Sequence, residues 1–492
     1  MKIYRSIGLN FIGNAWNGLL IVTTTPWYLA MLGVERYGLV GFWQVLLYVF
    51  LVFDLGLGAL LVREFARLQG EGRGRGAFVQ LLRWAERICL PAAVLITAGL
   101  ASGASWLATD WLRLNTIPAE VAASAIGWMS VSAGAQLMNA LYLNGLAGMQ
   151  RHGAMNLIQI VGYSLKYLGG GLVLQFTGDL GVFFAFQGAC MLALALLSRA
   201  VLGRVIRSVE RPAASRPEPM DKSVLWRFAA GMFATAVLGM LLTNTDRLAL
   251  SRLVSTEDLG RYSLAITAAS FLQMLVFAFY RAYYPLFAEL AARGDKTRLH
   301  AVYLTACRTV GAVVVPVAVL GWLFAPELIR IWLGQPDETT AGLFRWLLVG
   351  VSLAGLMWLP AAYQQAHGWT RLHVGLMALA LALGLPLTVL LVRHAGVQGG
   401  VAMMLLHGVI EISLGLLLMN RVYFPGKSLL WYGTVLFRPL ILAAPLAMLF
   451  RYWMPQDLSR VEEALWVLGA SAAVFVASLV QQRKLLFRRG TS

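Results

Sequence analysis

The chain has 492 residues, of which 59% are hydrophobic and only 13% are charged, and its formal net charge at pH 7 is +17. Together with a mean hydropathy of +0.70, this composition excludes a water-soluble protein with a polar surface and indicates a polytopic membrane protein. The 6 histidines and 3 cysteines have no metal-ligand spacing. We therefore predict no metal and no cofactor. All three cysteines, Cys89, Cys190 and Cys307, fall in or at the edge of apolar stretches, so we expect buried thiols and no disulfide.

Apolar stretches of roughly 20 residues recur along the chain, and as helices they are long enough to cross about 30 Å of hydrocarbon. We predict an all-α fold with about fourteen transmembrane helices. In chain order these helices cover residues 8–31, 38–62, 88–108, 121–145, 154–176, 181–202, 228–250, 260–283, 302–325, 342–363, 373–392, 399–419, 433–450 and 464–481. The first span follows Lys2 and Arg5 and contains asparagines, so we expect a retained helix rather than a cleaved signal.

The positive charge is distributed unevenly between the two sides of the predicted membrane. With fourteen spans, 29 Lys and Arg residues fall on one side and 10 on the other, and Lys166 lies inside a helix. This positive-inside pattern places both termini in the cytoplasm. The excess charge therefore reflects topology and attraction to anionic lipid, and we predict no nucleic-acid partner.

The order of spans and loops indicates an internal duplication. A shift of 222 residues places Glu35 and Gly38 on Glu257 and Gly260, and the same shift relates the next inter-helix loops. Two six-helix blocks have the same orientation, so we predict lobes in a parallel pseudo-twofold repeat, followed by two C-terminal helices. The predicted domains are an N-lobe at 1–205, a Pro-rich cytoplasmic linker at 206–225, a C-lobe at 226–422, and the last two helices with a basic tail at 423–492.

Several predicted helices carry polar residues on one face, a costly arrangement against lipid. One interpretation is that these faces line a hydrated cavity that binds substrate; the other is that the amides only join helices by hydrogen bonds. The candidate substrate-binding residues are Lys166, Asn14, Asn17, Gln136, Asn139, Gln159, Tyr163, Gln273, Tyr280 and Arg281.

Charges inside the predicted spans are the most specific signal. Lys166 is either a cavity cation that meets an anionic substrate, or a lysine that pairs with a buried carboxylate or reaches toward the interface. The embedded acids either bind a coupling ion or neutralise nearby arginines. Asp246 and Arg247, near the outer end of the span at 228–250, either form a gate or a structural ion pair across the halves, or contact the substrate. The candidate coupling or gating residues are Asp54, Asp246, Arg247, His407 and Glu411.

Motifs of soluble enzymes are absent from the sequence. The run GEGRGRG at 70–76 follows no predicted strand and lacks the ending of a phosphate-binding loop, so we predict a flexible basic loop. The longest predicted outward loops, near 110–120 and 326–340, leave no room for a catalytic domain. We therefore predict a protein that is not an enzyme.

Six motifs, in this order and spacing, resemble those of the multidrug/oligosaccharidyl-lipid/polysaccharide exporter superfamily, and specifically its polysaccharide transporter branch, which includes O-antigen flippases. The motifs are GVERYG at 33–38, DLGLGALLVREFAR at 54–67, LAGMQRHGAMN at 146–156, TDRLALSRLVSTEDLGRYSLA at 245–265, APELIRIWLG at 325–334 and QQAHGWTRLH at 364–373.

The resemblance implies a multi-pass protein of the bacterial cytoplasmic (inner) membrane. Such a protein would flip undecaprenyl-pyrophosphate-linked oligosaccharide units, for O-antigen or exopolysaccharide, from the cytoplasmic to the outer leaflet by alternating access. Its implied partners are the lipid-linked oligosaccharide, membrane lipids, and a polysaccharide polymerase with chain-length machinery. A monomer is expected because the chain contains both halves.

One departure from the family pattern concerns the substrate. Lipid II flippases of this superfamily carry arginines in the first helix, whereas no basic residue lies between Arg5 and Arg36 here. This difference argues against a peptidoglycan precursor as the main substrate.

Two alternative functions remain. An ion-coupled multidrug or metabolite antiporter of the same superfamily is the first alternative, although such antiporters usually have twelve helices and cavity acids. A membrane-bound glycan polymerase or ligase is the second, but it needs a large outer loop.

Overall fold

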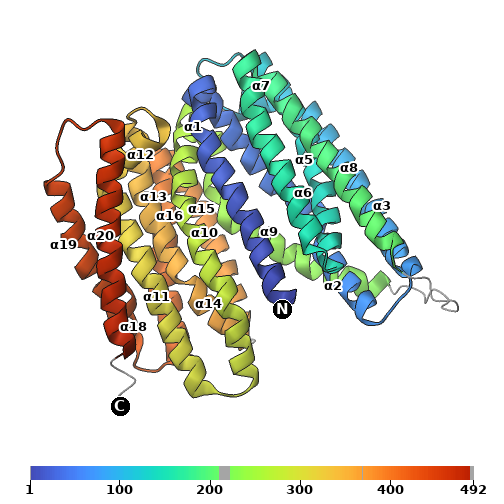
Figure 1. Ribbon diagram of the computed structural model, residues 1–492. Helices are drawn as coiled ribbons and strands as arrows, with labels where there is room; N and C mark the ends of the chain where they lie inside the picture. Colours follow the sequence, from blue (N-terminus) through green and yellow to red (C-terminus); the bar gives the residue numbers. More distant parts are fainter. Residues whose placement is uncertain (1, 210–221, 368–369, 488–492) are drawn as a thin grey trace. The chain divides into compact units, whose positions relative to one another are not determined.

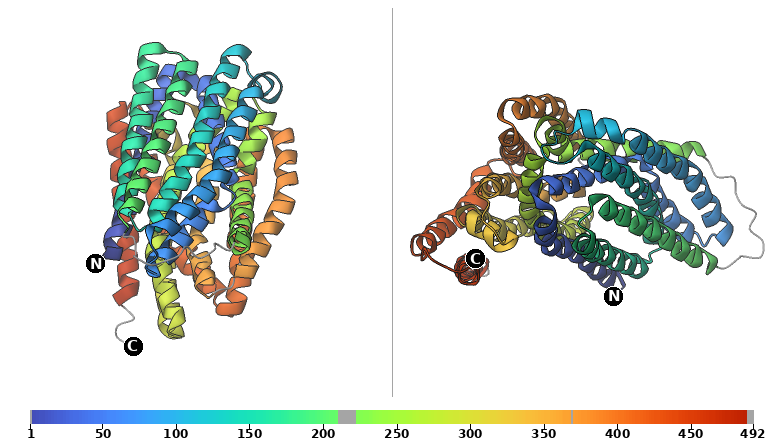
Figure 2. Two further views of the ribbon diagram at one scale, coloured as in Figure 1. Left: turned by 90° about the vertical axis from the view of Figure 1, so that its right-hand side faces the viewer. Right: turned by 90° about the horizontal axis from the view of Figure 1, so that it is seen from above.

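The computed structural model describes residues 2–209, 222–367 and 370–487. The chain forms two compact units, Met1–Gly260 and Arg261–Ser492. Within each unit the helices run side by side (Figures 1 and 2). The described residues contain no strand beyond one isolated bridge, so the predicted all-α fold is confirmed. Residues 210–221 of the predicted linker lie outside the described part, and the division into two lobes stays a prediction.

The first unit is built around α5. Its helices are α1 (Lys2–Leu51), α2 (Leu57–Gly70), α3 (Arg75–Ser102), α4 (Ala104–Trp106), α5 (Ala119–Gly148), α6 (His152–Ser164), α7 (Gly170–Thr177), α8 (Leu180–Arg207), α9 (Lys222–Leu253) and the first residues of α10. α5 packs along α8 and also contacts α1, α2 and α3. Small buried residues such as Ala122, Ala125 and Ala133 allow this close packing.

α1 is two antiparallel helices joined at Gly33. Gly33 has φ 74° and ψ 170°, a backbone conformation that is not helical and that glycine adopts readily. The hydroxyl oxygens of Thr25 and Tyr37 lie 3.4 Å apart, although a straight helix would separate these residues by roughly 18 Å. The chain therefore reverses here, which confirms that residues 8–31 and 38–62 belong to separate spans, although the second predicted span crosses the turn between Asp54 and Leu57.

The second unit is organised around α11. Its helices are α10 (Thr256–Ala292), α11 (Lys296–Leu323), α12 (Ala325–Leu333), α13 (Glu338–Leu356), α14 (Trp358–Ala366), α15 (Thr370–Ala395), α16 (Val397–Ile410), α17 (Leu416–Tyr423), α18 (Ser428–Trp431), α19 (Arg438–Tyr452) and α20 (Arg460–Phe487). α11 contacts α13, α19 and α20. The two C-terminal spans are thus part of the core of this unit, through a cluster that includes Phe324, Ala443 and Val474.

Twelve described helical stretches are long and apolar enough to cross a membrane. Two features explain the difference from about fourteen predicted spans. The stretch Trp16–Asp54 contains both antiparallel helices of α1, and α15 is represented only by its shorter apolar segment Leu381–Ala395. Each predicted span thus corresponds to a helix.

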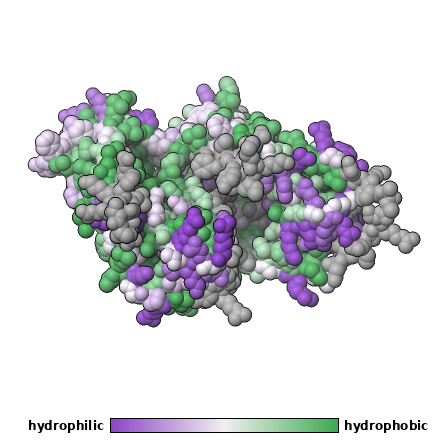
Figure 3. Space-filling view, turned by 60° about the horizontal axis from the view of Figure 1, so that its bottom comes forward, coloured by the Kyte–Doolittle hydropathy of each residue, from purple (hydrophilic) through white to green (hydrophobic). Residues whose placement is uncertain are grey.

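Large apolar side chains cover the outside of these helices. Leu95 is 72% exposed, Phe176 82% and Ile441 72%. Such extensive apolar exposure is unfavourable in water but normal toward lipid. The chain is a multi-pass membrane protein, and Figure 3 shows patches of hydrophilic side chains among hydrophobic ones at the end that is turned toward the viewer.

Two helix ends related by the predicted duplication have the same geometry. α2 and α10 are each followed by a glycine in the left-handed region, Gly72 with φ 64° and Gly294 with φ 70°. In both, the amide of the following residue donates to the carbonyl four residues before the glycine, Leu68 at 2.9 Å and Leu290 at 3.2 Å. This is the Schellman ending in both copies. The shift of 222 residues therefore relates hydrogen bonds as well as residue types, which supports duplication.

α3 begins at Arg75, well before the predicted start of its span at residue 88. The additional turns are amphipathic, because Phe78, Leu81 and Leu82 continue the buried face while the opposite face carries polar residues. Similarly, the outward loop predicted near 326–340 contains the short helix α12.

Candidate functional site

Lys166 lies in a π-helical segment, Leu165–Gly169, between α6 and α7. It is only 5% exposed. Its Nζ is 4.2 Å from the centroid of the Trp43 ring and 5.3 Å from that of Tyr167. Among the described residues no ion pair joins it to a carboxylate. A charge at this depth costs a few kcal/mol, and aromatic faces offset roughly 0.5–2 kcal/mol of that cost.

Neighbouring helices hold this segment in place. Gln187 of α8 donates to the Lys166 carbonyl at 3.1 Å, and Tyr28 of α1 donates to the next carbonyl at 2.6 Å. Trp43 packs edge-on against Phe184, with ring centroids 5.7 Å apart. π-helical segments inside α-helices occur often at functional sites. We therefore treat the buried Lys166 ammonium, held in place by these contacts, as a candidate substrate contact.

The other predicted cavity residues of the first unit differ in role. Asn139 accepts a 2.7 Å hydrogen bond from Ser198 and so joins α5 to α8. In contrast, the amide oxygens of Asn17 and Gln136 are buried without a hydrogen-bond partner in the described part of the chain, which costs about 1–3 kcal/mol for each oxygen. The rest are Gln159 and Tyr163, which are half-buried, and Asn14, whose side chain lies outside the described residues.

Asp54 lies at the turn into α2. Its Oδ1 accepts from the amide of Gly56 at 2.7 Å, and its Oδ2 from that of Gly58 at 3.2 Å. Leu55 and Gly56 both have positive φ, 53° and 74°. The carboxylate therefore stabilises a strained turn and the first amides of a helix. Its predicted coupling role stays a prediction.

Replacing Asp54 separates these two roles. We expect Asp54→Asn to retain transport, because its side-chain oxygen still accepts from the turn, whereas Asp54→Ala lowers the free energy of unfolding by about 1 kcal/mol. Transport activity in cells and thermal denaturation of the purified proteins provide the measurements. If instead Asp54→Asn abolishes transport at unchanged stability, the carboxylate is a coupling group.

In the second unit, Tyr280 belongs to a stack of aromatic rings along α10. Phe277 and Tyr284 lie nearly parallel to it, with centroids 6.0 and 5.6 Å away. The Trp358 ring meets the Tyr280 ring edge-on, with centroids 5.8 Å apart, and the Tyr280 hydroxyl donates to Gln365 Oε1 at 2.9 Å. Aromatic faces beside amides suit the apolar and hydroxyl faces of a sugar ring.

The remaining candidates are placed as follows. His407 Nε2 lies 3.5 Å from Glu411 Oε1 one turn later, and Glu411 begins another π-helical segment, Glu411–Gly415. Asp246 and Arg247 are half-buried on α9. The last two are Gln273, half-buried on α10, and Arg281, whose side chain lies outside the described residues.

The structure thus brings the Lys166 segment together with side chains that the sequence analysis did not select. Trp43 contacts the ammonium, whereas Gln187 and Tyr28 bind backbone carbonyls of the segment. A signal existed for Gln187, an amide within the apolar run FFAFQGACM, but none for Trp43, since an aromatic residue in an apolar span is ordinary.

Comparison with known proteins gives one sequence match. A family model described as polysaccharide biosynthesis protein matches residues 172–337. A search of curated protein sequences gave no match.

Solved structures share the fold across most of the chain. A lipid II flippase, MurJ, in an inward closed conformation has a TM-score of 0.68 at 12% identity, covering 96% of this chain and 99% of that one. An inward-facing multidrug resistance MATE family transporter of the MOP superfamily has a TM-score of 0.63 at 15% identity, covering 84% and 95%. A mutant of the Vibrio cholerae MATE transporter VcmN has a TM-score of 0.60 at 17% identity, covering 87% and 97%.

Proposed function

We propose that this chain, a member of the multidrug/oligosaccharidyl-lipid/polysaccharide exporter superfamily, flips a lipid-linked oligosaccharide from the cytoplasmic to the outer leaflet. The cargo is an undecaprenyl-pyrophosphate-linked repeat unit for O-antigen or exopolysaccharide. Transport follows alternating access and involves no covalent chemistry on the cargo. The observation that carries the proposal is Lys166, buried against Trp43 without a carboxylate partner in the described residues.

A flippase of this kind must lower a large desolvation barrier. Each glycan hydroxyl costs several kcal/mol to bury in hydrocarbon without a partner. The unpartnered amide oxygens of Asn17 and Gln136 and the rings around Tyr280 provide polar and aromatic groups that can replace water around a sugar. Lys166 provides the positive charge for the pyrophosphate.

The cellular setting follows from the same proposal. We propose a bacterial inner membrane protein with both termini in the cytoplasm, which the positive-inside distribution of Lys and Arg supports. A flipped repeat unit is next polymerised, so a polysaccharide polymerase and its chain-length machinery are the partners we expect. One chain contains both halves of the repeat, and we expect it to act as a monomer.

The rival function is an ion-coupled antiporter for drugs or metabolites, which the MATE-like fold makes a specific competitor. The pair of His407 and Glu411 is the feature that favours it, because a carboxylate next to a histidine can bind a proton. The buried cation favours the flippase, since a cationic drug would be repelled by Lys166.

Deleting the gene distinguishes the two functions. We expect undecaprenyl-pyrophosphate-linked oligosaccharide to accumulate on the inner leaflet of deletion cells, because the unit is made in the cytoplasm and cannot cross unaided. Lipid extraction with mass spectrometry measures the accumulation, and a plasmid-borne wild-type gene is the control that reverses it. If no lipid-linked sugar accumulates, the flippase proposal is wrong and the antiporter takes its place.

A further inference from the structure

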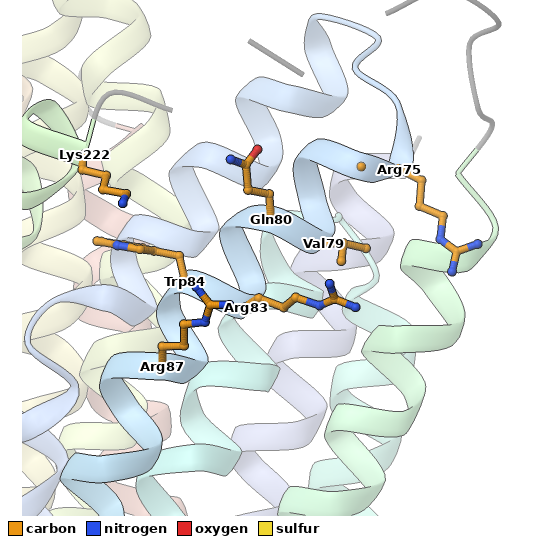
Figure 4. Close-up of a pocket in the computed structure, with 8 residues that line it drawn as sticks. Arg75, Val79, Gln80, Arg83, Trp84, Arg87 and Lys222 are labelled. Carbon is orange, nitrogen blue, oxygen red and sulfur yellow. The ribbon is translucent and has the colours of Figure 1, made fainter. Parts of the chain in front are cut away.

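The beginning of α3 and the beginning of α9 together line a basic pocket of 550 Å³ (Figure 4). The residues that line it are Arg75, Gly76, Val79, Gln80, Arg83, Trp84, Arg87 and Lys222. Four of these carry a positive charge and none carries a negative charge. In Figure 4 the Lys222 side chain extends toward the Trp84 ring. We call this feature the α3–α9 pocket.

The spacing on α3 concentrates this charge on one face. Gln80, Arg83, Trp84 and Arg87 recur at the i, i+3, i+4 and i+7 positions of a helix, opposite the buried Phe78. Arginines four residues apart repel each other by roughly 0.2–0.5 kcal/mol in an isolated helix. An anion bound between the two guanidinium groups would attract both of them and so offset their mutual repulsion.

Nearby carboxylates already have other partners. Glu86 pairs with Arg199 at 2.8 Å and accepts from Tyr142 at 3.1 Å. Glu71 pairs with Arg67 and Arg73 at 2.8 and 3.2 Å. Among the described residues, no ion pair joins a carboxylate to any of the four cations of the α3–α9 pocket. Within the described part of the chain, no carboxylate therefore competes with an anionic ligand for these cations.

Aromatic contacts fix the two walls of the pocket. The rings of Trp84 and Trp226 meet edge-on, with centroids 5.6 Å apart. The guanidinium of Arg63 on α2 lies 4.4 Å from the centroid of the Phe228 ring on α9. These contacts hold the first turns of α9 against α2 and α3, so that the cations are positioned before a ligand arrives.

The sequence around the pocket is typical of the boundary between a membrane span and its loop. The apolar part of α3 begins directly after Arg87, and Lys222 is the first residue of an apolar span, Lys222–Leu241. Tryptophans such as Trp84 and Trp226 prefer the interface between headgroups and hydrocarbon. The Lys and Arg distribution assigns this end to the cytoplasmic side.

We propose that the α3–α9 pocket binds the phosphate headgroup of an anionic lipid of the cytoplasmic leaflet. Arginine forks bind phosphate oxygens in pairs and the lysine adds a point charge, and basic pockets between helices on this side of a membrane bind such headgroups. The proposal does not depend on which cargo the protein moves. The phosphate belongs either to a bulk phospholipid or to a polyprenyl pyrophosphate.

Lipid binding to the purified full-length protein tests the proposal. The probes are short-chain phosphatidylglycerol and undecaprenyl pyrophosphate, and native mass spectrometry measures their apparent Kd. We expect the double variant Arg83→Gln/Arg87→Gln to weaken binding of at least one probe about tenfold or more. The probe that binds the wild type more tightly identifies the source of the phosphate.

A matched variant separates the pocket from general surface charge. Arg204 and Arg207 are exposed in the last turn of α8 and do not line the pocket, so Arg204→Gln/Arg207→Gln should change both Kd values less than about twofold. Equal weakening by the two double variants, or none by the first, overturns the proposal. Lys222→Gln, at an exposed helix end, should weaken binding about fivefold and tests the pocket without altering α3.

Discussion

Replacing Lys166 by methionine is expected to lower transport about tenfold or more while leaving the protein as stable as the wild type or more stable. The ammonium lies over the Trp43 ring without a carboxylate partner in the described residues, so burying it costs free energy that methionine, of similar length and apolar, does not incur. If Lys166 had only a structural role, the methionine variant would instead be less stable than the wild type and would keep its transport activity. Accumulated lipid-linked oligosaccharide and the thermal midpoint of the purified variant measure the two effects.

Two further variants serve as controls for this experiment. Lys166→Arg keeps the positive charge and should retain part of the transport, because the charge rather than the amine meets the pyrophosphate. Lys296→Met removes a lysine at the exposed beginning of α11 and should have no effect. Full transport by Lys166→Met would remove Lys166 from the site without affecting the proposed flippase function.

The helices could be predicted because hydrocarbon imposes one requirement on every span. Backbone groups must be paired within the segment, and the side chains must be apolar over about 20 residues. Hydropathy alone could separate the two helices of α1 only because of the short polar stretch around Glu35. The 3.4 Å contact of Thr25 with Tyr37 is the physical evidence for that reversal.

The site could be predicted only in part, since it depends on contacts between distant segments. A lysine inside an apolar run is conspicuous in the sequence, and the structure places Lys166 in a buried position. Its partners Trp43 and Gln187 belong to other helices, and no periodicity relates them to residue 166. Asn139, which belongs to the same kind of polar stripe as Asn17, instead joins two helices.

The α3–α9 pocket was not predicted for a different reason. Arg83 and Arg87 contribute to the positive-inside pattern, so topology explains their presence without any further role. Only the packing of α9, through Trp226 on Trp84, brings Lys222 to the same place. The charge distribution predicts only the side of the membrane, whereas tertiary contacts form the pocket.

At one end of the first unit, residues related by the 222-residue shift pack against each other. An ideal Cβ on Gly38 would lie 2.0 Å from the Thr256 carbonyl oxygen, and one on Gly260 would lie 2.4 Å from that of Val34 and 3.3 Å from the Gly38 Cα. At the same end, the Glu35 carboxylate accepts hydrogen bonds from the backbone amides of residues 115 and 116 and so joins α1 to this loop. The backbones can approach this closely only without side chains at the two glycines.

Even the methyl group of Gly38→Ala is therefore expected to destabilise the protein by about 1–3 kcal/mol, because backbone atoms must move apart. This corresponds to a fall of roughly 1–3 °C in the thermal midpoint of a chain of this length, together with a large loss of transport, because we expect the close approach of these backbones to be part of the transport cycle. Gly260→Ala should act in the same way. Gly99→Ala, at an exposed position of α3 with no atom within 4 Å of the added Cβ, is the control. If Gly38→Ala is as stable and active as Gly99→Ala, the close approach of the two repeat copies has no part in the transport cycle.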